Sequence, residues 1–212
     1  MRYALVVWDF DGTLADTLEN VLQIFNEIAP GFGLAPITDA QTLRDTTPME
    51  FLRTRKIPLW KLPALRQAVV ARQREAMAHI RLHPGIPDVL AQLGRKGCQM
   101  GIVSSNAEEN IRICLRAHAT EPWFEFIVGY PRLFGKQRML RRIVRQRGLA
   151  PHTVLYVGDE VRDILAARDA GMDVAAVTWG ANSPGLLARH APTHLVREPD
   201  QLCEVLLGPN AE

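Results

Sequence analysis

The stretch that decides the fold is Tyr3-Ala-Leu-Val-Val-Trp8, which continues into Asp9-Phe-Asp11-Gly12-Thr13. An uninterrupted apolar run of this length favours a strand that is buried on both faces, as in a parallel sheet. The run ends at a pair of carboxylates, and the glycine after them lets the chain turn sharply. We therefore predict a buried first strand that has acidic side chains at its carboxyl end.

Similar short apolar runs recur along the chain, and helical patterns separate them. The runs lie at 100–103, 126–128, 154–157, 174–177 and 194–196, and the helical patterns at 87–96, 108–117, 136–147, 163–170 and 199–207. Strands that alternate with helices predict an α/β fold, a doubly wound parallel sheet of the Rossmann-like kind. In such sheets ligands bind beyond the carboxyl ends of the strands, where the polar residues of this sequence follow each run.

The interval between the first strand and residue 83 breaks this alternation. It contains no convincing strand but has helical patterns at 18–29, 48–55 and 62–80, separated by prolines and glycines. We predict a helical cap at 16–83 that lies above the crevice. The α/β catalytic core then comprises 1–15 and 84–212.

Composition limits the classes of function. The chain has 212 residues, of which 47% are hydrophobic and 23% charged, and its formal net charge of +2 argues against a dedicated nucleic-acid binder. Cys98, Cys114 and Cys203 are too scattered for a disulfide framework or a zinc pattern. The first apolar run is too short for a signal peptide or a membrane span. We expect a cytoplasmic protein without a membrane partner, and the sequence does not predict its oligomeric state.

Asp9 and Asp11 are the first candidates for chemistry. An Asp-Gly pair can simply mark a turn. A buried parallel strand, however, has little structural use for two carboxylates at its end, whereas a phosphoryl-transfer site needs such groups. Asp9 can attack phosphorus and form an aspartyl-phosphate. Asp11 can protonate the leaving oxygen and later deprotonate the hydrolytic water.

A second acidic cluster follows the run at 154–157, where Asp159 and Asp163 are four residues apart. Acidic residues are also common at the start of a helix, as an N-cap or in the first turn. Beside Asp9 and Asp11 these carboxylates would repel one another. A hard divalent cation would relieve the repulsion, and carboxylates, water and phosphate oxygens are ligands of Mg²⁺. We therefore predict a Mg²⁺ site.

Ser104 and Lys136 complete the predicted set. A hydroxyl at a strand end and a lysine at the start of a helix can both donate to phosphoryl oxygens, where charge develops in the transition state. Each has an ordinary alternative, because Ser104 can cap the following helix and Lys136 can be a surface lysine.

In this order and spacing, the motifs resemble those of the haloacid dehalogenase superfamily of hydrolases. They are Asp9-x-Asp11-Gly-Thr, Ser104, Lys136 and Gly158-Asp159-x-x-x-Asp163. The stretch from Gly158 to Gly180 is similar to the phosphoglycolate-phosphatase-like branch. The resemblance covers nearly the whole chain, and the insertion at 16–83 looks like the helical cap of that superfamily.

The resemblance implies a role for each carboxylate. Asp9 matches the nucleophile and a metal ligand. Asp11 matches the acid/base, whose backbone carbonyl also contacts Mg²⁺, and Asp159 and Asp163 match the metal-binding acids. The dehalogenases of the superfamily lack an acid at the position of Asp11, so its presence here favours phosphate chemistry.

The resemblance also implies that Ser104 and Lys136 bind the phosphate. The family often has an asparagine directly after this serine, but here Ser105 intervenes before Asn106. Which of the three side chains, Ser104, Ser105 or Asn106, contacts the phosphate stays open.

In the predicted cap, Arg44 lies where related caps contact their substrates. An arginine there can grip an anionic substrate bidentately. The alternative is a surface salt bridge with Asp45 or another neighbour.

The sequence thus predicts a phosphatase that hydrolyses a small phosphorylated metabolite, with phosphoglycolate suggested by the branch similarity. A sugar phosphomutase uses the same core motifs. A phosphonate hydrolase would need a cap lysine that forms an imine, and Lys56 and Lys61 are poorly placed for it by pattern. An inactive binding protein is disfavoured because the acidic set is complete.

Overall fold

The computed structural model describes residues 2–129 and 135–208. In this part of the chain, six parallel strands form one sheet in the order β3-β2-β1-β4-β5-β6. The strands are β1 (Leu5–Trp8), β2 (Met100–Ser104), β3 (Phe126–Gly129), β4 (Val154–Gly158), β5 (Asp173–Val177) and β6 (His194–Val196). This is the strand order of a doubly wound sheet, so the predicted α/β fold class is confirmed.

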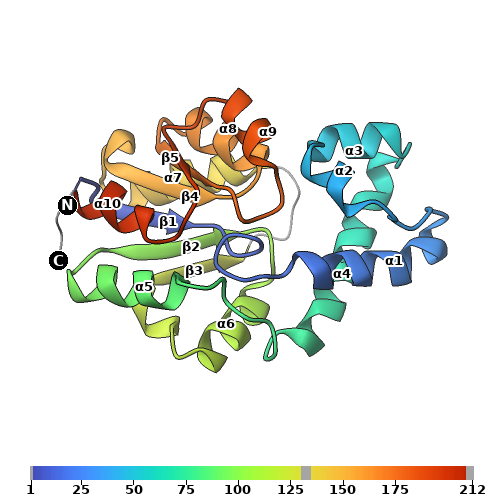
Figure 1. Cartoon of the computed structure of the whole chain (residues 1–212), viewed down its shortest axis with the longest axis horizontal. Coiled ribbons are helices and arrows are strands. Elements are labelled where there is room, and N and C mark those ends of the chain that lie inside the picture. Colours follow the sequence, from blue (N-terminus) through green and yellow to red (C-terminus); the bar gives the residue numbers. More distant parts are fainter. Residues whose placement is uncertain (1, 130–134, 209–212) are drawn as a thin grey trace.

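The sheet is buried on both faces by helices (Figure 1). One face packs against α5 (Ile86–Arg95), α6 (Glu108–Ala117) and α10 (Gln201–Leu207), and the other against α7 (Lys136–Gln146), α8 (Val161–Asp169) and α9 (Pro184–Arg189). Alternate residues of β1 serve the two faces: Val6 and Trp8 lie in one core, and Leu5 and Val7 in the other. The continuous apolar run of the sequence has this physical cause.

A separate group of helices lies beside one end of the sheet (Figure 1). It contains α1 (Leu18–Ile28), α2 (Ala40–Arg44), α3 (Pro48–Thr54), α4 (Leu62–Ala76) and the 3-10 helices Ala29–Phe32 and Leu59–Lys61. Two further 3-10 helices, Glu121–Trp123 and Pro151–Thr153, precede strands of the sheet. The helical group has a small core of its own, made by Phe25, Ala29, Ile37 and Leu65.

The chain leaves and re-enters the sheet layer at neighbouring points. Ala15 and Leu82 form an antiparallel bridge. Next to it, the amide of Asp16 donates to the carbonyl of Arg81 (2.9 Å), and the amide of His83 donates to the carbonyl of Leu14 (2.9 Å). The outgoing and returning segments are thus held side by side. A division into core and cap at these points stays a prediction.

Several element boundaries differ from those that the sequence predicts. The helix predicted at 62–80 ends at Ala76, and the next residue, Met77, is fully buried in the core on one face of the sheet. The helices α2 and α9 were not predicted, since five and six residues are too few to show a helical period. No helix of the described residues is both long and apolar enough to cross a membrane.

Candidate active site

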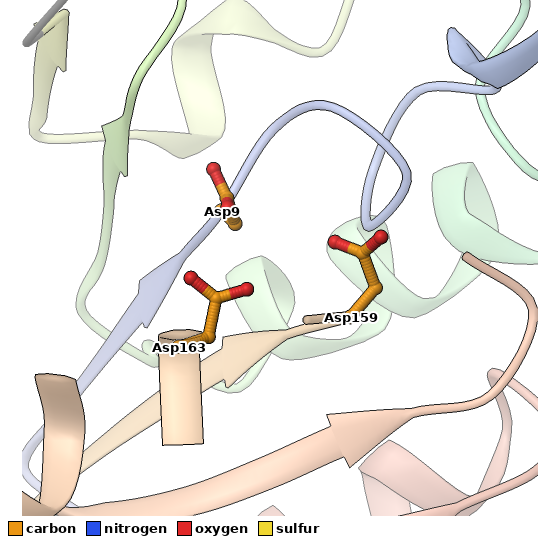
Figure 2. Close-up of side chains that lie close together, drawn as sticks. All are labelled: Asp9, Asp159 and Asp163. Carbon is orange, nitrogen blue, oxygen red and sulfur yellow. The ribbon is translucent and has the colours of Figure 1, made fainter. Parts of the chain in front are cut away.

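Three carboxylates from distant parts of the chain meet at the carboxyl edge of the sheet (Figure 2). Asp9 follows β1, Asp159 follows β4, and Asp163 lies in the first turn of α8. One carboxylate oxygen from each lies within 4.8 Å of the other two, and all three residues are buried. The strands β1 and β4 are neighbours with Trp8 paired to Val157, so the residues that follow them must lie side by side.

Backbone and hydroxyl donors fix the orientation of the three side chains. Asp9 accepts a bond from the amide of Phe10 (2.8 Å). Asp159 accepts from the hydroxyl of Thr13 (2.8 Å) and from the amide of Ala181 (2.7 Å). Asp163 accepts from the amide of Glu160 (3.1 Å) through Oδ2, and its other oxygen points into the site.

Asp163 also has the structural role that acidic residues commonly have at the start of a helix. Glu160 and Asp163 form a reciprocal capping box at the start of α8. Asp159 lies one residue before this box. The N-cap alternative is therefore wrong for Asp159, whereas Asp163 is both an acid of the first turn and a member of the acidic cluster.

Two glycines leave the space that Asp159 occupies. Gly12, at φ +72°, and Gly180 lie on either side of it, and a Cβ atom added to either glycine would overlap the Asp159 carboxyl group. The sharp turn after Asp11 and the loop after β5 can approach the acidic group only as glycines.

Lys136 lies among the carboxylates. It is the first residue of α7, and its Nζ contacts Asp9 Oδ2 at 2.6 Å and Asp163 Oδ1 at 2.5 Å. Its side chain is only 11% exposed. The surface-lysine alternative is therefore wrong.

The charges around Asp9 favour its ionised form. Burial alone would raise the pKa of Asp9, but the positive charges of Lys136 and Arg162 outweigh burial and hold this pKa below its usual value. Burial would likewise lower the pKa of Lys136, yet the charges of Asp163 and Asp9 raise it. Asp9 is thus kept as an anion and Lys136 as a cation.

The negative charges of Asp159 and Asp163 are not balanced by nearby positive charges to the same extent. Burial and the charges of Glu160, Asp163 and Asp9 raise the pKa of Asp159 well above its usual value. Burial also raises the pKa of Asp163, to about 6, although Lys136 opposes the shift. Among the residues that the structure describes, no lysine or arginine pairs with Asp159.

This donor set fits a divalent cation. Three buried carboxylates with a shortage of positive charge around Asp159 can hold a metal ion that supplies the missing charge. Oxygen donors alone are the ligands that hard cations prefer.

Asp11 lies apart from this group and faces other partners. Its Oδ1 accepts from the side-chain amides of Asn106 (3.0 Å) and of Gln73 (3.5 Å), and the latter comes from α4. Burial and the charge of Asp9 raise the pKa of Asp11. A carboxyl group that keeps its proton to higher pH suits a general acid. Its expected metal contact involves the backbone carbonyl, and that contact stays a prediction.

The end of β2 and the loop after it orient their three polar side chains differently. Ser104 Oγ accepts from the amide of Asn106 (3.3 Å), and the Asn106 side chain turns to Asp11. The Ser105 hydroxyl faces Arg162, which donates to it at 3.4 Å. All three residues are buried at the site, and the phosphate contacts of Ser104, Ser105 and Lys136 stay predictions.

Arg44 joins the helical group to the loop that follows β5. Its guanidinium donates to the carbonyl of Thr178 (3.1 Å), and its own carbonyl accepts from the amide of Ser183 (2.7 Å). Asp45 accepts a bond from the Ser183 hydroxyl rather than pairing with Arg44. A substrate contact of Arg44 stays a prediction.

Two arginines at the site were missed from the sequence. Arg66 of α4 donates to the carbonyl of Ser105, and Arg162 of α8 pairs with Glu160 at 2.6 Å. Burial and the charge of Arg162 lower the pKa of Arg66 to about 10. Arg162 lies inside the second acidic motif and could have been noticed there. Arg66 has no sequence signal, because four other arginines or glutamines of the same polar appearance lie in the same helix.

Comparison with known proteins identifies the family. Residues 6–177 match the family described as haloacid dehalogenase-like hydrolase. The chain belongs to this family. The resemblance inferred from the acidic motifs is confirmed, and the matched residues include both acidic clusters.

Relatives with assigned names include two phosphatases. The chain is 35% identical to a phosphoglycolate phosphatase of Synechococcus elongatus, over 95% of this chain and 96% of the relative. It is 29% identical to an N-acetylmuramic acid 6-phosphate phosphatase of Pseudomonas aeruginosa, over 97% and 96% of the two chains. A solved structure of a predicted phosphatase from Clostridium acetobutylicum superposes with a TM-score of 0.84 at 19% identity, covering 99% of this chain and 100% of that one, which supports the fold.

Proposed function

We propose that this protein is a magnesium-dependent phosphatase that hydrolyses the phosphate ester of a small metabolite through a phosphorylated Asp9. The observation that supports this proposal most strongly is the meeting of Asp9, Asp159 and Asp163 with Lys136 at one edge of the sheet. Family membership and the phosphatase relatives support the same conclusion.

The residues divide the reaction into two steps. Asp9, ionised next to Lys136, attacks phosphorus, and the P–O bond to the leaving alcohol breaks. Asp11, whose pKa is raised by burial, gives its proton to the leaving oxygen. Asp11 then takes a proton from water, which attacks phosphorus and releases phosphate from Asp9.

The remaining groups of the site bind the phosphoryl group and neutralise its charge. Lys136 and the Ser104 hydroxyl donate to phosphoryl oxygens, as preorganised donors that need no rearrangement during the reaction. Mg²⁺ held by Asp9, Asp159, Asp163 and the Asp11 carbonyl would supply charge neutralisation for the phosphoryl group.

The helical segment at 16–83 acts in this scheme as a cap. Gln73 of α4 reaches Asp11, and Arg44 reaches the loop after β5, so the segment contacts the core on two sides of the site. Such a cover excludes bulk water and contacts the leaving group. The free cysteines Cys98, Cys114 and Cys203 agree with a place in the reducing cytoplasm.

The names of two relatives suggest the substrate. Phosphoglycolate and N-acetylmuramic acid 6-phosphate are both phosphate esters of hydroxy acids, so each carries a carboxylate besides the phosphate. We propose a substrate of that kind, with phosphoglycolate as the first to be tested.

The test is release of inorganic phosphate from a panel of phosphorylated metabolites, with Mg²⁺ and with excess EDTA. The proposal expects Mg²⁺-dependent phosphate release. Transfer of the phosphoryl group to another position of a sugar, without phosphate release, would instead indicate a phosphomutase. No reaction with any ester would refute the proposed function.

A further inference from the structure

Two guanidinium groups from different parts of the fold meet at Ser105. Arg66 comes from α4 and donates through Nη2 to the Ser105 carbonyl, and Arg162 comes from α8 and donates through Nη2 to the Ser105 hydroxyl at 3.4 Å. Ser105 itself is buried. The predicted roles of the site residues leave both arginines without a function.

Both arginines have hydrogen-bonding capacity to spare. The Nε atom of each is buried and has no hydrogen-bond partner among the described residues. Arg162 pairs with Glu160, whereas Arg66 forms no ion pair with a carboxylate in the part of the chain that the structure describes. A buried N–H without an acceptor is costly, so an anion that accepts from these groups would be strongly favoured.

The position of Arg66 indicates which part of a substrate it would meet. Arg66 and Gln73 are seven residues apart in α4 and therefore lie on the same face of the helix. Gln73 donates to Asp11, the group that protonates the leaving oxygen in the proposed reaction. This face of α4 is thus on the leaving-group side, whereas Lys136 lies on the side of the attacking Asp9.

We propose that Arg66, assisted by Arg162, binds a carboxylate carried by the leaving group of the substrate. The inference rests on the proposed phosphatase function and narrows its substrate to the phosphate ester of a short hydroxy acid. A guanidinium group suits this task because its planar fork matches a carboxylate with two parallel hydrogen bonds. The carboxylate would be held by α4 and α8 together.

The experiment compares two esters of similar size, 2-phosphoglycolate and 2-hydroxyethyl phosphate, which differ in the carboxylate. The measured quantity is the ratio of their kcat/KM values with Mg²⁺ present. We expect the wild-type protein to prefer 2-phosphoglycolate. Arg66→Gln should lower that ratio by about 10- to 100-fold, the usual effect of losing a charge-assisted hydrogen bond. Arg66→Lys, which keeps the charge but not the fork, should give an intermediate ratio.

Arg74→Gln is the matched control. Arg74 lies in the same helix, its side chain is 63% exposed, and its pairing with Glu109 spans 3.9 Å at the surface. It should keep the wild-type ratio. Thermal unfolding of each variant checks that it is folded, and Arg66→Lys provides the measurement if Arg66→Gln does not fold.

Two results would overturn the inference. One is a wild-type protein that hydrolyses phosphate esters but does not prefer the carboxylated one. The other is a folded Arg66 variant in which both esters lose the same factor, because Arg66 would then bind the phosphoryl group or only support the structure. Failure of the proposed function itself looks different, since no ester would release phosphate in the wild-type protein.

Discussion

At the scale of single residues, Asp9 and Asp11 have the same functional group but opposite surroundings. Lys136 contacts Asp9 and helps to hold its pKa low. Asp11 accepts from two neutral amides, and burial and the charge of Asp9 raise its pKa. Two carboxyl groups whose pKa values are pushed apart can act as nucleophile and acid at the same pH.

Asp9→Asn tests the nucleophile. The amide is a poor nucleophile but has the same shape, so it can still accept from Phe10. We expect turnover to fall by more than about 10³-fold while the fold is kept. Steady-state kinetics and circular dichroism measure the two effects. A folded variant with normal turnover would assign the attack to another residue.

Asp11→Asn tests the acid. An alkyl phosphate has a leaving group that needs a proton, so its hydrolysis should slow by about 10²–10⁴-fold. The first step with p-nitrophenyl phosphate should lose much less, because p-nitrophenolate leaves without protonation. Burst kinetics separate the first step from the second. Equal first-step losses on both esters would show that Asp11 is not the proton donor.

Whether the sequence predicts that a residue lies at the site depends on the residues next to it in the chain. Asp9, Asp159 and Lys136 each adjoin a strand end or a helix start, so their position could be inferred from local patterns. Arg66 lies inside α4, and its place at the site depends on how α4 approaches the loop after β2, which no local pattern encodes.

At the scale of elements, the site depends on loops that approach one another closely. The turn after β1 and the loop after β5 enclose the Asp159 carboxyl group, which bonds to Thr13 on one side and Ala181 on the other. The runs of apolar residues predicted the strands well, because burial on both faces leaves a continuous signal. Short helices such as α9 begin with a serine cap but have no such signal.

Gly180→Ala tests this close approach. The added methyl group would overlap Asp159 and displace it, so the Mg²⁺ concentration needed for half-maximal activity should rise by about 10- to 100-fold. Gly185→Ala is the control, because no atom lies within 4 Å of the Cβ that it adds. An unchanged Mg²⁺ requirement in Gly180→Ala would mean that Asp159 is not a ligand.

At the scale of the whole molecule, the sheet order brings the two acidic motifs together. Roughly 150 residues separate Asp9 from Asp159, yet β1 and β4 are paired neighbours, so both carboxylates reach one point. Sequence reasoning predicted this meeting because parallel strands share a carboxyl edge. It did not predict the contacts between the helical group and the core, which depend on side chains such as Gln73 and Arg44.

The crowding of carboxylates should make stability depend on pH and on Mg²⁺ together. Burial raises the pKa of Asp163 from its usual 3.8 to about 6, so between these values the metal-free folded state binds more protons than the unfolded state. The contribution of protonated Asp163 to the free energy of unfolding is therefore complete below about pH 4 and is lost as the pH rises through about 6. The loss is on the order of 2–3 kcal/mol.

Mg²⁺ should offset that loss, because it binds the ionised carboxylates of the folded state. At a concentration of about 100 times its Kd it adds about 2.7 kcal/mol, which corresponds to a rise in Tm of about 5–10 °C for a chain of this size. At pH 5 protons compete with the cation for Asp163, so the rise should be much smaller than at pH 7.5. Scanning calorimetry at both values, with and without Mg²⁺, measures the difference. Asp163→Asn should remove the part of the pH dependence that Asp163 contributes, whereas the raised pKa values of Asp159 and Asp11 keep the rest. An equal rise in Tm at pH 5 and pH 7.5 would show that the cation does not bind the carboxylates that burial perturbs.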